Sequence, residues 1–187
     1  MLNVMITIDT ELWPDSPGWP HTPLVVGTRC ERELEAYFFG GGPAGLGLPY
    51  QLRVFHDAGL KAIFFVEPLF SFTLGAEPLH RVLDLIATHH QEVGLHLHPE
   101  WLTSARRPDL PAFRGPFIRQ YSEHEQVMLL RAGEQRLRDL GAPPIRCFRA
   151  GNWGADSTTL RAMAQVGIVI DSSLNAAFPT SFPERAS

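Results

Sequence analysis

In Glu92-Val93-Gly94-Leu95-His96-Leu97-His98-Pro99-Glu100, a short run rich in apolar residues ends in a histidine, a proline and an acid. The run has the length of a β-strand, and the proline ends it because proline cannot donate a hydrogen bond to a sheet. A helical pattern with one apolar face precedes this strand at Leu79–His89. Another helix follows at Ser122–Gly141, opened by a Ser-x-x-Glu capping signature.

The same alternation extends in both directions from this strand. The predicted strands span Val4–Glu11, Ala62–Val66, Glu92–His98, Ile145–Phe148 and Ile168–Ile170, and the first three are predicted to be buried. The predicted helices span Arg29–Phe39, Pro49–Ala58, Leu79–His89, Ser122–Gly141 and Asp156–Val166. When strands alternate with helices, each crossover returns the next strand parallel to the last. The sequence thus predicts an α/β fold of about five βα units, in a single domain over residues 1–187.

Composition and charge exclude several classes of protein. The chain has 187 residues, of which 44% are hydrophobic, as in an ordinary globular domain. Its net charge is −4 and its 16 basic residues are scattered, so nucleic acid is not an expected partner. No window approaches the ~20 apolar residues of a membrane span. The amino-terminal residues predict a strand without a charged leader, so we expect a cytoplasmic protein, of undetermined oligomeric state.

Acids and histidines gather where the predicted strands end. Asp9 and Glu11 lie two residues apart after the first strand, and His96 and His98 do so at the end of the third. Residues two apart in a strand share a face, where two carboxylates repel unless a cation or a proton separates them. A His-x-His pair can chelate zinc. Alternatively, Glu11 lies beyond the strand and faces solvent, and one of the two histidines is exposed without a metal.

Further polar residues follow the same strand ends. Glu100, four residues after His96, is a candidate ligand or a group that orients one imidazole. Arg149 needs a carboxylate if it is buried, and Asp9 and Asp171 are candidates. Parallel α/β folds place function at the carboxyl ends of their strands, so these residues are expected to meet in one site. Aromatic residues in the strand-end loops suit sugar rings or core lids: Trp13, Trp101 and Trp153.

Five segments resemble known motifs in their order along the chain. They are Ile6–Glu11, Lys61–Val66, Glu92–His96, Phe148–Gly151 and Gly167–Ser173. Together they resemble the polysaccharide deacetylase family, the NodB-homology carbohydrate esterases. The resemblance implies a distorted barrel of parallel strands. It also implies one divalent metal, often zinc, held by an acid and two histidines, and hydrolysis of N- or O-linked acetyl groups on sugars.

Carried over by position, the resemblance gives roles to three residues. Asp9 resembles the general base, His96 the first metal-binding histidine, and Arg149 the arginine that orients the base. The Pro-Tyr pair that follows the arginine in the family is replaced by Gly151-Asn152, and a backbone N–H in this turn would stabilise an oxyanion. The expected catalytic residues are therefore Asp9, Arg149 and Asn152.

The chain departs from the family pattern at the metal ligands. Thr10 replaces the second of two adjacent aspartates, which shifts the metal-binding acid to Glu11. Glu100 occupies the place of the second metal-binding histidine, which makes His98 the expected ligand. The expected ligands of a divalent metal, zinc foremost, are Glu11, His96 and His98, with Glu100 and Asp171 as supporting groups or alternative ligands.

No segment corresponds to the family's last motif, which carries the histidine that acts as general acid. We therefore expect a truncated chain and an incomplete barrel, because five parallel strands cannot close one. The expected function is a metal-dependent hydrolase that removes acetyl groups from a sugar or polysaccharide. The alternative is a non-catalytic carbohydrate-binding or regulatory relative of the same fold.

Overall fold

A parallel sheet forms the centre of the protein. The computed structural model describes residues 4–13, 21, 28–41, 45–105 and 107–177. Its strands are β1 (Ile6–Thr10), β2 (Ala62–Val66), β3 (Glu92–Leu97), β4 (Cys147–Ala150) and β5 (Ile170–Asp171). They pair in the order β1-β2-β3-β4-β5, and every pair is parallel. The predicted α/β class and the five parallel strands are confirmed, and within the described residues the sheet remains an open one.

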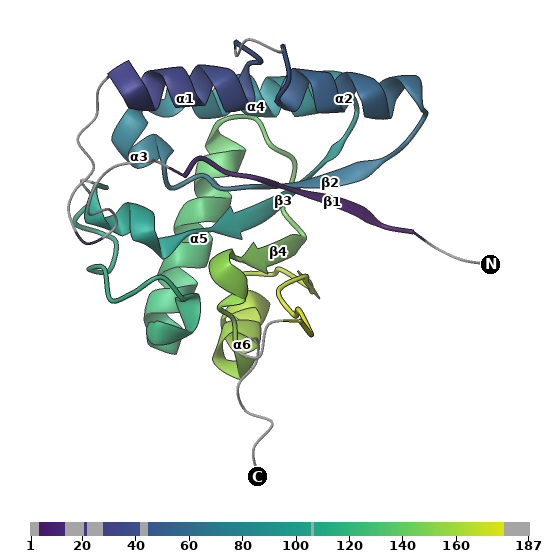
Figure 1. Ribbon diagram of the computed structural model, residues 1–187. Helices are drawn as coiled ribbons and strands as arrows, with labels where there is room; N and C mark the ends of the chain where they lie inside the picture. Colours follow the sequence, from purple (N-terminus) through teal and green to yellow (C-terminus); the bar gives the residue numbers. More distant parts are fainter. Residues whose placement is uncertain (1–3, 14–20, 22–27, 42–44, 106, 178–187) are drawn as a thin grey trace.

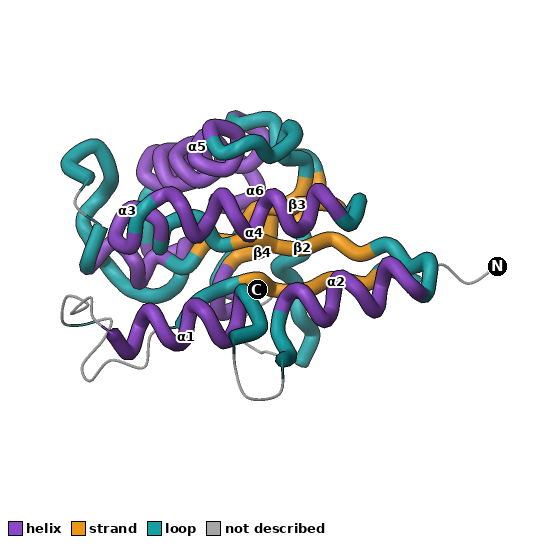
Figure 2. The backbone as a smooth tube through the Cα atoms, turned by 90° about the horizontal axis from the view of Figure 1, so that it is seen from above, coloured by secondary structure: helices purple, strands orange, loops and turns teal. Residues whose placement is uncertain are grey.

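Helices connect the strands and cover the sheet. They are α1 (Thr28–Phe38), α2 (Leu48–Asp57), α3 (Ser71–Leu74), α4 (Ala76–Thr88), α5 (Glu123–Asp139) and α6 (Ser157–Gln165). Short 3₁₀ turns lie at η1 (Pro99–Thr103), η2 (Ile118–Gln120) and η3 (Gly151–Trp153). Helices α1, α2 and α4 lie together on one side of the molecule, whereas α5 and α6 lie beside β3 and β4 (Figure 1). Seen from above, α2 and α4 pass over the strands (Figure 2).

The helix ends follow from local chemistry. Ser122 and Glu125 form the predicted capping box at the start of α5, and Asp156 caps α6. Helix α4 begins at Ala76, earlier than expected, because Pro78 falls in its first turn, where a missing N–H costs nothing. The predicted apolar face of α4 is buried and packs into the core through Leu79, Val82, Leu83 and Ile86.

The two outer strands of the sheet are partly exposed. Strand β1 starts at Ile6, and Val4 and Met5 before it are 76% and 74% exposed. Strand β5 starts at Ile170, and Val169 and Ile170 are 64% and 50% exposed. Each strand has a neighbour on one side only, so the prediction that the first strand is buried is wrong. An apolar run alone does not distinguish a central strand from an edge strand.

The sheet is strongly curled. Arg149 on β4 donates through Nη2 to Thr7 Oγ1 on β1, at 2.8 Å, and to Ser172 Oγ after β5, also at 2.8 Å. In a flat sheet β1 and β4 would lie about 14 Å apart, at three interstrand spacings. One side chain can bridge them only because the sheet bends toward itself. Strand β4 extends to Ala150, two residues beyond its predicted end, because Arg149 and Ala150 pair with His96 and Leu97 of β3.

Gly94 in β3 leaves space for the ring of Phe65, which packs against Arg149 of the candidate site. A Cβ at this position would lie 2.6–2.7 Å from ring atoms of Phe65 and 2.8 Å from Cys147 Sγ. The Phe65 ring in turn lies under the Arg149 guanidinium, at 4.3 Å. We expect Gly94→Ala to lower the free energy of unfolding by about 1–3 kcal/mol. The added methyl group would overlap the side chains of Phe65 and Cys147, which would have to move within a closely packed region.

Urea denaturation measures this loss, with Gly41→Ala as the matched control. A Cβ at Gly41 would meet its nearest neighbour at an ordinary 3.5 Å. The control is expected to change the free energy of unfolding by no more than about 0.5 kcal/mol. Equal stabilities of the two variants would contradict the tight packing at Gly94.

Candidate metal centre

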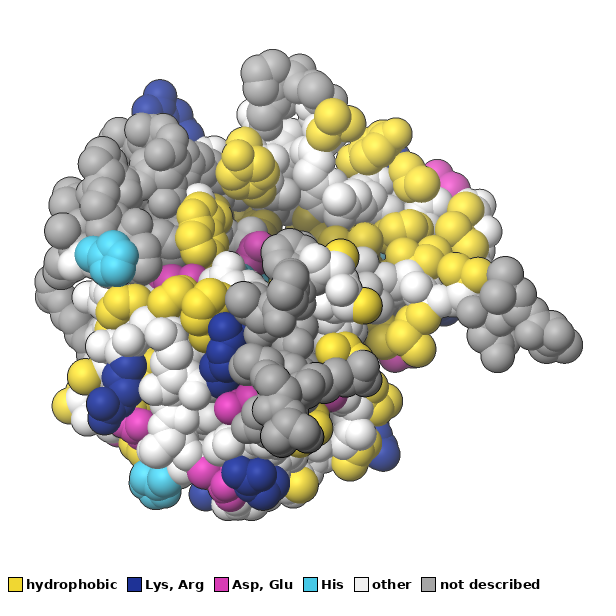
Figure 3. Space-filling view, turned by 60° about the horizontal axis from the view of Figure 1, so that its bottom comes forward, with side chains coloured by type: hydrophobic (Ala, Val, Ile, Leu, Met, Phe, Trp, Pro, Cys, Tyr) yellow, Lys and Arg dark blue, Asp and Glu magenta, His cyan; other side chains and the backbone are white. Residues whose placement is uncertain are grey.

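The carboxyl ends of β1, β3 and β4 open into a cavity of about 630 Å³. On this face the surface is hollowed, with hydrophobic side chains on the rim and acidic side chains inside (Figure 3). Every site residue predicted from the sequence lines the cavity except Asp171. The lining consists of Asp9, Glu11, Trp13, His21, His96, His98, Glu100, Pro116, Phe117, Arg149, Ala150, Asn152 and Trp153.

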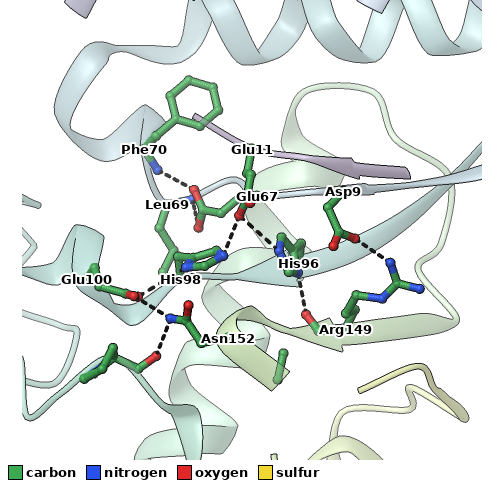
Figure 4. A network of polar contacts seen from close by, with 12 residues as sticks. Asp9, Glu11, Glu67, Leu69, Phe70, His96, His98, Glu100, Arg149 and Asn152 are labelled. Carbon is green, nitrogen blue, oxygen red and sulfur yellow. Dashed lines mark hydrogen bonds and ion pairs between the residues drawn. The ribbon is translucent and has the colours of Figure 1, made fainter. Parts of the chain in front are cut away.

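Glu11, His96 and His98 converge on one point. Glu11 Oε2 lies 3.2 Å from His96 Nε2 and 2.5 Å from His98 Nε2. One ligand atom from each of the three residues lies within 4.8 Å of the other two. Both histidines are buried, and the side chain of Glu11 is one-third exposed. Figure 4 shows the carboxylate of Glu11 in contact with both imidazoles. These are the three residues that the sequence predicted as metal ligands, and the structure brings them together.

The donor set suits a divalent cation. His96 Nδ1 lies 2.7 Å from the backbone oxygen of Arg149. A carbonyl oxygen can only accept, so Nδ1 carries the proton and a neutral ring presents a lone pair at Nε2. That lone pair faces Glu11 Oε2, and two acceptors repel unless a proton or a cation lies between them. Catalytic zinc sites use three protein ligands, and two histidines with a glutamate are one such set.

The charges of the cluster favour cations. Burial alone would raise the pKa of Glu11, but the neighbouring imidazoles of His96 and His98 outweigh it and hold the pKa well below its usual range. Burial alone would lower the pKa of His98, but pairing with Glu100 and Glu11 outweighs it and raises the pKa to about 10. The carboxylates thus attract positive charge to the imidazoles, and a divalent cation competes with protons for the same nitrogen atoms.

Glu100 supports His98 from behind. Its side chain is buried, and its Oε2 lies 3.4 Å from His98 Nδ1, on the side of the ring away from Glu11. Its Oε1 accepts a hydrogen bond of 2.6 Å from Asn152 Nδ2. Glu100 is therefore placed to orient an imidazole, the second of the two roles considered for it.

Asp9 and Arg149 form the second half of the site. Arg149 Nη1 donates to Asp9 Oδ1 at 2.6 Å, and the guanidinium is held further by Thr7, Ser172 and the ring of Phe65. Of the two carboxylates considered as partners of Arg149, Asp9 and Asp171, it is Asp9 that pairs with the guanidinium. Asp9 and Glu11 both line the cavity. Asp9 is paired with Arg149, and Glu11 is paired with His98.

Asp171 has a structural position instead. Its carboxylate accepts from the backbone N–H and the hydroxyl of Ser173, at 3.1 and 2.6 Å. Ser173 Oγ in turn accepts from the backbone N–H of Ala150 at 2.9 Å. Asp171 therefore fixes the chain after β5 against the end of β4, and it does not join the group of candidate ligands.

Aromatic side chains form part of the cavity wall. Trp13 packs edge-on against His98, with ring centroids 5.1 Å apart, and is 46% exposed. Phe117 and Trp153 also line the cavity, whereas Trp101 is fully buried in the core. Phe117 lies in an irregular loop without periodicity, so no sequence pattern marked it.

Glu67 holds the loop beside the centre. It is fully buried after β2, and its oxygens accept from the backbone N–H groups of Leu69 and Phe70, both at 3.0 Å. Burial raises the pKa of Glu67 to about 8, against the opposing effect of these hydrogen bonds. We expect Glu67→Ala to lower the free energy of unfolding by about 2–4 kcal/mol, because two buried donors lose their acceptor.

Thermal and urea unfolding test this role of Glu67. The control is Glu67→Gln, which keeps the shape and one acceptor oxygen and is expected to be less destabilising than Glu67→Ala. If Glu67→Ala were as stable as the parent protein, the two backbone hydrogen bonds would contribute nothing to the fold.

The comparisons with known proteins identify the fold. No protein-family model and no curated protein matches the chain. A structure from Mycobacterium smegmatis, assigned provisionally to the polysaccharide deacetylases, superposes with a TM-score of 0.58 at 18% identity, over 91% of this chain and 50% of that one. The chain has the fold of the CE4 polysaccharide deacetylases. Five parallel strands flanked by helices match the CE4 architecture, of which the open sheet is an incomplete form.

Two further CE4 structures show the same likeness. One is a mutant, with restored activity, of a CE4 family pseudoenzyme from Bacillus anthracis (TM-score 0.53, 16% identity, 89% of this chain and 43% of that one). The other is the peptidoglycan N-acetylglucosamine deacetylase Bc1960 (TM-score 0.52, 16% identity, 89% and 54%). The chain thus spans about half the length of the CE4 proteins it resembles. In its described part, no helix is long and apolar enough to cross a membrane.

Proposed function

We propose that this chain is a metal-dependent hydrolase that removes N- or O-linked acetyl groups from a sugar or polysaccharide. The observation that supports the proposal most is the pairing, in one cavity, of a Glu-His-His group with an Asp-Arg pair. Glu11, His96 and His98 would hold the cation, and their donor set suits zinc. When bound, the cation supplies a Lewis acid that polarises an acyl carbonyl and acidifies water.

Asp9 is the proposed general base. Arg149 engages its Oδ1, and among the described residues no partner occupies Oδ2, so this oxygen can accept a proton from the attacking water. Arg149 fixes the orientation of the carboxylate through this hydrogen bond. The side-chain amide of Asn152 is already bonded to Glu100, so the proposed oxyanion donor in this turn is the backbone N–H. The aromatic wall of the cavity offers flat apolar faces to a sugar ring.

Acetate release tests the proposal. The purified chain, supplied with zinc or cobalt, is incubated with N-acetylglucosamine oligomers and with O-acetylated xylan, and free acetate is measured. Release from either substrate supports the hydrolase, and the substrate that reacts identifies the linkage.

The second candidate is a non-catalytic carbohydrate-binding protein, and it is supported by the presence of a pseudoenzyme among the CE4 structures of similar fold. Titration calorimetry with the same sugars separates the two candidates. Binding without acetate release would favour the second, and neither binding nor release would overturn both.

A further inference from the structure

Glu100 links His98 to the turn after β4. Glu100 is 1% exposed, and the hydrogen bond from Asn152 Nδ2 to its Oε1 is the contact that directs its carboxylate (Figure 4). The other oxygen, Oε2, then lies toward His98 Nδ1 at 3.4 Å and accepts no hydrogen bond from the described residues. His98 Nδ1 is likewise buried without a hydrogen-bond partner among the described residues. Because unpaired buried polar atoms are costly, these two atoms are placed to pair with each other.

The backbone of the same turn is shaped around His98. Asn152 adopts φ 54° and ψ 21°, a left-handed conformation that asparagine tolerates better than most residues. At Gly151 a Cβ would lie 2.8 Å from two ring carbons of His98 and 2.6 Å from the backbone oxygen of Leu97. The turn therefore packs against the imidazole of His98 at Gly151. Through the side chain of Asn152, it also holds the Glu100 carboxylate on the far side of that imidazole.

We propose that Asn152 is a positioning residue of the metal centre, which sets the affinity and coordination of the cation through Glu100 and His98. A carboxylate that accepts the Nδ1 proton of a ligating histidine fixes its tautomer and raises the basicity of Nε2. Asn152 holds Glu100 in the orientation that directs Oε2 toward His98 Nδ1, 3.4 Å away. This inference rests on the proposed metal site and adds a residue that touches neither the cation nor the substrate with its side chain.

Cobalt binding to the whole chain tests the inference, with Co²⁺ alone as the probe. Its affinity is measured by titration calorimetry, and its coordination by the visible absorption spectrum. Asn152→Gly removes the amide and relaxes the left-handed backbone, and Asn152→Asp places a second carboxylate against Glu100. Both are expected to weaken Co²⁺ binding ~10–100-fold and to change the spectrum. The exchanged pair Glu100→Gln/Asn152→Asp restores a hydrogen bond and is expected to bind Co²⁺ more tightly than Asn152→Asp alone.

A control variant separates positioning from general destabilisation. Asp156→Ala removes the cap of α6, just beyond the turn, and is expected to lower the melting temperature without changing Co²⁺ affinity or spectrum. If the Asn152 variants bind as the parent does, or lose no more affinity than the control does, Asn152 has no positioning role. If the parent itself binds no Co²⁺, the proposed metal site fails and this inference fails with it.

Discussion

A His96→Ala/His98→Ala variant is expected to bind divalent cations at least ~100-fold more weakly than the parent protein, because two of the three proposed ligands are removed and even outer groups contribute ~10-fold each. The structure places both ring Nε2 atoms against one oxygen of Glu11, so neither imidazole can substitute for the other. Titration with Zn²⁺ or Co²⁺ measures the loss. Elemental analysis of the freshly purified proteins shows whether a metal is carried through purification.

The matched control replaces two histidines that lie outside the cavity. His56 and His80 are exposed on α2 and α4, and His56→Ala/His80→Ala is expected to bind the cation as the parent does. Circular dichroism checks that both double variants are folded. Glu11→Gln provides a milder test, since it removes the negative charge and keeps the shape. Unchanged affinity in both His96→Ala/His98→Ala and Glu11→Gln would rule out this centre.

Much of the candidate site was predictable because parallel strands bring their carboxyl ends to one edge. Asp9, Glu11, His96 and His98 follow apolar runs directly, and their convergence required only the order of strands and helices. The α5 capping box was equally local, since its signature spans four residues.

What the sequence did not predict depends on contacts between distant segments. The hydrogen bond between Glu100 and Asn152 joins residues 52 apart, and neither residue belongs to a periodic pattern. Glu67 also follows the end of a strand, and only the structure shows that its carboxylate turns to its own loop and does not line the cavity. The solvent exposure of the edge strand β1 and the curl of the sheet are also properties of the tertiary structure. Both depend on which strands become neighbours.

Asp9→Asn is expected to lower acetate release by ~100- to 10,000-fold, the contribution typical of a general base, while leaving cation affinity within about twofold. Asparagine keeps the shape and still accepts from Arg149 through Oδ1, so the guanidinium keeps a partner. The amide that replaces Oδ2 cannot accept a proton. Rates and Co²⁺ affinity measured on the same preparation separate the role of a base from that of a ligand.

The matched control is Asp84→Asn, the same change at an exposed carboxylate on α4, which is expected to leave both quantities unaltered. If Asp9→Asn lost cation and activity together, Asp9 would be a ligand, and the Glu11-His96-His98 group would need a fourth protein donor. If the Asp9→Asn variant kept full activity, another residue would remove the proton from water. The Asp9–Arg149 ion pair would then serve only to connect β1 and β4. Acetate release and cation affinity together show whether Asp9 acts as a base or as a ligand. They can do so because asparagine retains the contact with Arg149 and removes only the basicity of the carboxylate.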